Sequence, residues 1–237
     1  MEESAIMKCG DRMLRLQHPY ISIESNGAVS YGGNQQSSDN AMVGKCGCGI
    51  IAATDLLLYL SRYHMRETPP VFGELMQRFP FRAEGYYRCI SAMRRRYFPL
   101  IPHAGINGLM LMTGMEKFFR ENNMPYRARW GLRRRDMWEK MEAMLREDIP
   151  VIMSVGPNFP AFWGDKRAYF YRRDISGELR PAARVKAHYF TVTGMDEQWL
   201  MISSWGKRYY LSRSEFERYV SEYSADFVSN ILYITRR

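Results

Sequence analysis

Two residues of types that support nucleophilic catalysis, Cys48 and His188, stand far apart in the sequence. Cys48 follows the short segment Lys45-Cys46-Gly47 and directly precedes a strongly apolar run. A cysteine at the start of a helix lies at the positive end of the helix dipole, where a thiolate is stabilised and the pKa of the thiol falls. A thiol nucleophile also needs a base, most often a histidine. The pattern therefore predicts a Cys–His pair.

His188 is the best candidate among the four histidines of the chain. It opens the run 188–194, which has the apolar pattern of a strand. By contrast, His18 precedes a proline, His64 ends the apolar run and His103 lies among prolines. The interval of 140 residues between Cys48 and His188 also falls within the roughly 130–150 residues that separate the two groups in papain-like enzymes.

The hydrophobic pattern predicts the elements that must position this pair. Residues 49–63 are apolar around most of a helical circumference, which is typical of a helix buried in a core. An Asn26-Gly27 turn predicts a hairpin over 20–33. Further helices are expected over about 106–122 and over 136–147, the second capped by Asp136 with Glu139 at the third position. Strands are expected at 151–155, 168–172, 188–193, 199–203, 208–211 and 228–235, with one short helix opened by the capping box that begins at Ser212.

Helices and strands are segregated along the chain, which is the signature of the α+β class. We expect one domain over 1–237, with a mainly helical part over 1–149 and a mainly antiparallel sheet over 150–237. The cysteine would lie at a helix N-terminus that packs on this sheet, and the cleft would lie between the two parts.

These motifs resemble the papain-like cysteine peptidase superfamily, and most closely its bacterial branch related to peptidases that process double-glycine leader peptides. The first block is Cys48-Gly49-Ile50-Ile51-Ala52-Ala53, continuing to Leu56-Leu57 and Tyr59. The second block runs from His188 to Thr193, through Gly194-Met195-Asp196 and 199–202, to Ser203-Ser204-Trp205-Gly206. An alignment on Cys46 would instead place Thr54 and Asp55 at the leucine positions, so Cys48 is preferred.

The resemblance implies a thiol hydrolase, most simply a peptidase that cleaves a peptide or another amide substrate. Cys48 would be the nucleophile and His188 its base, and the reaction would need no metal or cofactor. Ser203 falls at the position that orients the imidazole, where the family has Asn or Asp. The oxyanion glutamine of the family usually lies six residues before the nucleophile, which here is Met42, so Gln35 is assigned this role, with Asn40 as the other amide nearby.

Other functions remain open for the same residues. An amidase or an acyltransferase could use the same Cys–His site with a different acceptor, because a fold does not fix a substrate. A catalytically inactive binding protein on this scaffold, with a basic surface, is the third hypothesis. The Cys46–Cys48 spacing alone does not predict zinc, because Cys9 and Cys89 lie far away in the sequence.

Composition limits the class of protein. The 237 residues are 46% hydrophobic and 25% charged, which argues against a disordered or fibrous chain. No apolar run approaches the ~18–20 residues of a membrane span, and no export signal is recognised, so a cytoplasmic protein with reduced thiols and no membrane partner is expected. The net charge of +9 and the runs Arg94–Arg96 and Arg133–Arg135 suit either an anionic partner or a solvated basic surface.

Overall fold

The computed structural model describes residues 13–237, so Cys9 and most of the N-terminal segment searched for an export signal lie outside the described part. The helices are α1 (Ala41–Cys46), α2 (Cys48–Tyr63), α3 (Ala83–Arg96), α4 (Gly108–Glu121), α5 (Arg134–Arg146) and α6 (Arg213–Tyr223). The strands are β1 (Leu14–Arg15), β2 (Ser22–Ser25), β3 (Ala28–Tyr31), β4 (Phe81–Arg82), β5 (Tyr126–Trp130), β6 (Val151–Val155), β7 (Ala168–Arg173), β8 (Leu179–Val185), β9 (His188–Met195), β10 (Trp199–Ser204), β11 (Lys207–Ser212) and β12 (Ile231–Arg236). Short 3-10 helices lie at η1 (Gln35–Ser37), η2 (Pro70–Phe72), η3 (Leu75–Gln77) and η4 (Ala161–Trp163).

Two sheets organise the chain. The larger has the order β5-β12-β6-β9-β10-β11-β7-β8, with β1 paired to β9 beside this path, and all its pairings are antiparallel. The smaller sheet, β3-β2-β4, contains the predicted hairpin, and both Asn26 and Gly27 adopt the positive φ angles that a tight two-residue turn requires. The predicted α+β class is confirmed.

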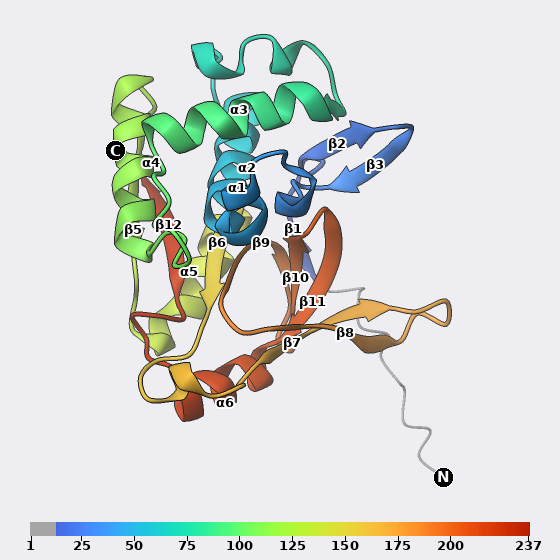
Figure 1. Cartoon of the computed structure of the whole chain (residues 1–237), viewed down its shortest axis with the longest axis vertical. Coiled ribbons are helices and arrows are strands. Elements are labelled where there is room, and N and C mark those ends of the chain that lie inside the picture. Colours follow the sequence, from blue (N-terminus) through green and yellow to red (C-terminus); the bar gives the residue numbers. More distant parts are fainter. Residues whose placement is uncertain (1–12) are drawn as a thin grey trace.

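Helix α2 lies at the centre of the molecule, flanked by α3 and α4 and packed on β9 and β6 (Figure 1). Thirteen of its sixteen residues are buried, from Gly49 to Ser61. Because the helix is apolar on nearly every side, it can be stable only when other elements surround it. Its first residue, Cys48, is therefore fixed against the sheet that carries His188.

A buried carboxylate closes the other end of α2. The Asp148 side chain accepts hydrogen bonds from Tyr59 Oη (2.6 Å) and from the backbone N–H of Gln17 (2.7 Å), and its Oδ2 lies 2.6 Å from His18 Nδ1 and 3.2 Å from His64 Nε2. Burial raises the pKa of this carboxyl, but the hydrogen bonds outweigh burial and hold the pKa below its ordinary value. His64 is the C-cap of α2, and its imidazole also contacts the carboxylate of Asp148.

Three details differ from the sequence-based predictions. Helix α5 begins at Arg134 with Arg133 as its N-cap, so Asp136 lies within the first turn and does not cap the helix. Strand β5 adds a strand of the large sheet to the part expected to be mainly helical. Strand β8 was missed, because Pro181 disfavours a strand except at a sheet edge, which is where β8 lies.

Candidate active site

Cys48 is the first residue of α2, and the residue before it, Gly47, is the N-cap. No side chain caps this end of the helix. The first backbone N–H groups of a helix have no partner within the helix, so they face whatever approaches Cys48. Gly49 has little room for a side chain, because an added Cβ would lie 2.5 Å from Ile106 and 3.3 Å from Tyr189. The Cys48 side chain itself is half-buried.

His188 is the first residue of β9 and pairs with Val155 of β6. Its Nε2 forms a hydrogen bond with Ser204 Oγ at 2.7 Å. The second ring nitrogen, Nδ1, takes no part in this bond. The Trp205 ring stacks on the imidazole, with 4.4 Å between ring centroids and an interplanar angle of 22°. A strand end, a hydroxyl and an indole thus fix the orientation of His188.

The residue that contacts the imidazole is Ser204, whereas the sequence analysis assigned Ser203 to this position. The Ser203 hydroxyl donates a hydrogen bond to the backbone carbonyl of Tyr31, at 2.8 Å. Adjacent side chains of a strand point to opposite sides, so an error of one residue exchanges the two hydroxyls. A β-bulge between Met201 and Ile202 also shifts the pairing of β10 with β9, which the sequence pattern did not reveal.

Gln35 and Cys48 line the same cavity. The glutamine belongs to the 3-10 helix η1, is buried, and donates from Nε2 to the Gly44 carbonyl at 3.1 Å. Asn40, the other candidate amide, is the N-cap of α1, where its side chain accepts from two backbone N–H groups. The structure therefore places Gln35 on the cavity wall, whereas Asn40 does not line the cavity.

The cavity shared by Cys48 and His188 has a volume of about 10 Å³, which is room for about one water molecule. Its polar lining includes Gln35, Cys48, Asp55, His188, Ser203 and Ser204. Among the described residues, no group of three His, Cys, Asp or Glu side chains is arranged to hold a metal ion.

Asp55 is a member of this cavity that the sequence analysis did not single out. It lies two turns after Cys48 on α2 and accepts hydrogen bonds from Tyr86 Oη (2.7 Å) and the Gly33 backbone N–H (2.9 Å). Burial raises its pKa to about 6, although these hydrogen bonds lower it. The available signal was a single acidic residue within an otherwise apolar helix, which normally has a buried partner.

The electrostatics differ from the expected thiolate. Burial raises the pKa of the Cys48 thiol, and backbone groups of Tyr189 and Gly49 counter this effect only in part. Burial also lowers the pKa of His188 to about 3. Removal from water penalises the charged form of each group. Both shifts favour a thiol and a neutral imidazole over a thiolate–imidazolium pair.

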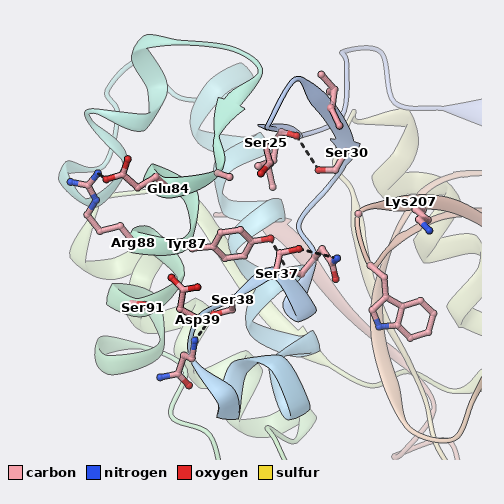
Figure 2. Close-up of a pocket in the computed structure, with 18 residues that line it drawn as sticks. Ser25, Ser30, Ser37, Ser38, Asp39, Glu84, Tyr87, Arg88, Ser91 and Lys207 are labelled. Atoms are coloured by element: carbon pink, nitrogen blue, oxygen red, sulfur yellow. Dashed lines mark hydrogen bonds and ion pairs between the residues drawn. The ribbon is translucent and has the colours of Figure 1, made fainter.

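A groove of about 820 Å³ adjoins this cavity and shares Trp205 with it as a wall. Its lining includes the polar residues Ser25, Ser30, Ser37, Asp39, Tyr87 and Lys207 beside apolar ones such as Ile23 and Val29. Figure 2 shows Lys207 across the groove from Glu84 and Arg88. The segment that carries Gln35 also contributes Asn34 to this groove, so one loop borders both spaces.

The arginine runs are partly paired within the protein. Arg96 forms an ion pair with Glu121 at 3.0 Å, and Arg134 forms one with Asp226 at 2.9 Å. These pairs reduce the positive charge that the two runs present to an anionic partner. Within the described residues, no helix is both long and apolar enough to cross a bilayer.

The comparisons with known proteins establish the fold. No family model and no curated protein matches the sequence. A crystal structure from Bacillus anthracis, provisionally described as a C39-like peptidase, superimposes with a TM-score of 0.50 over 95% of this chain and 99% of that chain. The sequence identity is 11%. At this identity the likeness supports a papain-like peptidase fold and does not identify the chemistry.

The raised pKa of Asp55 predicts a pH-dependent stability. Between its ordinary value of 3.8 and about 6, the folded state binds more protons than the unfolded state, so the free energy of unfolding falls as pH rises. The full shift corresponds to about 3 kcal/mol. In urea titrations between pH 4 and pH 7, Asp55→Asn should lose this part of the pH dependence. The exposed Asp39→Asn is the control, and identical pH profiles for wild type and Asp55→Asn would contradict the assignment.

Proposed function

We propose that this protein is a papain-like cysteine peptidase that cleaves amide bonds through Cys48 and His188. The observation that carries the proposal is the meeting of four groups at one small cavity. The thiol lies at the start of a buried helix, the imidazole is fixed by Ser204 and Trp205, and the Gln35 amide lies on the cavity wall. Nucleophile, base, positioning group and oxyanion donor are the components that acyl transfer through a thiol requires.

The chemistry begins from neutral partners. As Sγ of Cys48 attacks the carbonyl carbon of the substrate, its proton passes to Nδ1 of His188, so that general-base catalysis replaces a preformed ion pair. The carbonyl oxygen becomes an oxyanion, and the Cys48 backbone N–H and the Gln35 amide are the donors available to it. The imidazolium then returns the proton to the leaving amine. Water, deprotonated by His188, hydrolyses the thioester and releases the free enzyme.

Two neighbours support the transient imidazolium. The Ser204 hydroxyl can accept the Nε2–H bond, although a hydroxyl stabilises positive charge less than a carboxylate does. The indole of Trp205 stacks on the ring, where its π face favours a cation. This combination replaces the Asn or Asp that the resemblance leads one to expect.

We infer that the substrate chain occupies the groove beside Trp205. A cavity of about 10 Å³ cannot hold a peptide, so the reacting group must displace part of the wall. Trp205 is shared by the cavity and the groove, and it leads from β10 into a turn in which Trp205 and Gly206 both have positive φ angles.

A catalytically inactive binding protein is the second candidate. The observations that favour it are the closed cavity, the low pKa of His188 and the hydroxyl at the position that orients the imidazole. In that case the groove would bind a ligand without cleavage. The two candidates differ in whether product formation depends on Cys48.

One test of this proposal concerns the nucleophile. Incubation with a mixed peptide library, followed by mass spectrometry, should detect cleavage by wild type and by Cys46→Ala, since Cys46 is a free thiol outside the cavity lining. Cys48→Ala should reduce the rate by about a thousandfold or more. An added amine tests for acyl transfer, because an acyltransferase would form the amide of that amine.

Cleavage that persists in Cys48→Ala would overturn the proposal. A folded protein that binds peptides but cleaves none, in wild type as in Cys48→Ala, would establish the binding protein instead. The Cys46→Ala variant is the control, because it shows whether the loss of any thiol near α2 is enough to change the activity.

Another test of the proposal uses the two adjacent serines, Ser203 and Ser204, as a matched pair. Ser204→Ala removes the hydrogen bond to His188 and should lower kcat about tenfold to a hundredfold with little change in KM. Ser204→Thr keeps the hydroxyl and should retain most of the activity. Ser203→Ala loses the bond to the Tyr31 carbonyl and the contact with the Tyr20 hydroxyl. It should lower the free energy of unfolding by about 1 kcal/mol with kcat nearly unchanged. The reverse order of effects would restore Ser203 as the positioning residue.

A further inference from the structure

The loop between β6 and β7, residues 156–167, exposes three aromatic side chains. Phe159 is 76% exposed, Phe162 is 53% exposed and Trp163 is 79% exposed. The rings of Phe162 and Trp163 contact each other with 5.6 Å between centroids. Large apolar groups gathered on one exposed loop are unusual in a soluble protein and mark a surface that another body covers.

Four cations lie on this loop or on the neighbouring end of β8, and we call them, with the three aromatics, the aromatic-basic patch. Lys166 and Arg167 follow Trp163 within three to four residues, and Arg184 and Lys186 come from the neighbouring strand β8 and the residue after it. The ammonium of Lys186 lies 5.5 Å from the centre of the Phe162 ring. The loop contains one carboxylate, Asp165, whose pKa Arg167, Arg184 and Lys186 help to lower.

The shape and charge of the aromatic-basic patch favour a lipid surface over a nucleic acid or a second copy of the chain. The aromatic side chains protrude from the surface, and no lining residue of the neighbouring hollow beside β7 and α6 is Phe159, Phe162 or Trp163. Stacking sites for nucleic-acid bases combine aromatics with a groove, and these three aromatics line neither the groove beside Trp205 nor the hollow beside β7 and α6. A second copy of the chain meeting this face would bring its own cations against these four. A fluid anionic layer accepts protruding rings and cations together.

We propose that the aromatic-basic patch docks the protein on the surface of an anionic lipid bilayer. Trp163, Phe162 and Phe159 would enter the boundary between headgroups and acyl chains, where indole rings are favoured. Lys166, Arg167, Arg184 and Lys186 would contact the lipid phosphates, with each cation near the surface adding to binding. Binding of this kind needs no membrane-spanning helix and grows with both buried apolar area and anionic lipid content.

The patch lies at the end of the sheet that carries His188. The loop begins directly after Val155, whose backbone pairs with His188, and Lys186 precedes His188 by two residues. A membrane that contacts the patch would therefore lie beside the candidate active site. Docking does not depend on the proposed peptidase activity, since it uses none of the residues assigned to that reaction.

Cosedimentation of the full chain with lipid vesicles tests this proposal. Vesicles of phosphatidylcholine alone should retain little protein, whereas an equal mixture of phosphatidylcholine and phosphatidylglycerol should sediment it at low salt. The double variant Phe162→Ala/Trp163→Ala should weaken binding by at least about tenfold. Lys166→Gln/Lys186→Gln should weaken it by about tenfold or more. Cys48→Ala should bind as wild type does, which separates this result from the fate of the peptidase proposal.

The control is Ile175→Ala. Ile175 is fully exposed and lies in the turn at the far end of the β7–β8 hairpin, opposite the end that joins the patch. It should leave vesicle binding unchanged. The proposal is overturned if the anionic vesicles bind no better than neutral ones or if the aromatic double variant binds normally. It is also overturned if the aromatic double variant impairs only cleavage or binding of a soluble peptide, which would make the loop a substrate contact.

Discussion

The burial of α2 against the large sheet is the constraint on which the candidate site depends. The helix is apolar on nearly every side, so it must be surrounded, and β9, β6, α3 and α4 surround it. This packing sets Cys48 at the first turn of the helix beside the first residue of β9, His188. The same packing limits the access of water to both groups, which raises the pKa of the thiol and lowers that of the imidazole. Position and electrostatics therefore have one physical cause.

Polar groups inside this core join the elements around the cavity. Asp55 connects α2 to α3 through Tyr86 and to the loop before η1 through the Gly33 N–H. That loop leads to Gln35, and its neighbour Gly32 has no space for a side chain, since an added Cβ would lie 2.2 Å from Ser203 Oγ. A buried carboxylate with partners on two elements favours one arrangement of the loop over others. The loop that leads to Gln35 is thus held by the same helix that begins with Cys48.

Much of this arrangement follows from the sequence, because its strongest patterns are also its most buried segments. The buried helix, the tight turn at Asn26-Gly27 and the cap of α6 at Ser212 follow from local rules of periodicity and capping. Local rules do not predict the register of one strand against its neighbour. The bulge in β10 and the choice between Ser203 and Ser204 depend on pairing with β9. The prediction of a lowered pKa for Cys48 was wrong for a similar reason. Burial raises this pKa, and the extent of burial depends on all the elements that pack around the thiol.

If Cys48 and His188 rest as a neutral pair, alkylation of Cys48 by iodoacetamide should follow an ordinary or raised thiol pKa, and the pH dependence of this alkylation is the most direct test. Peptide mass mapping can follow Cys48 separately from Cys46 and Cys89 in wild type and in His188→Ala. For a neutral pair, we expect alkylation of Cys48 to rise with pH to a midpoint above the ordinary thiol value of 9.0, and we expect His188→Ala to change this midpoint little. Fast alkylation that persists into the acidic range in wild type and disappears in His188→Ala would reveal a thiolate–imidazolium pair and contradict the account.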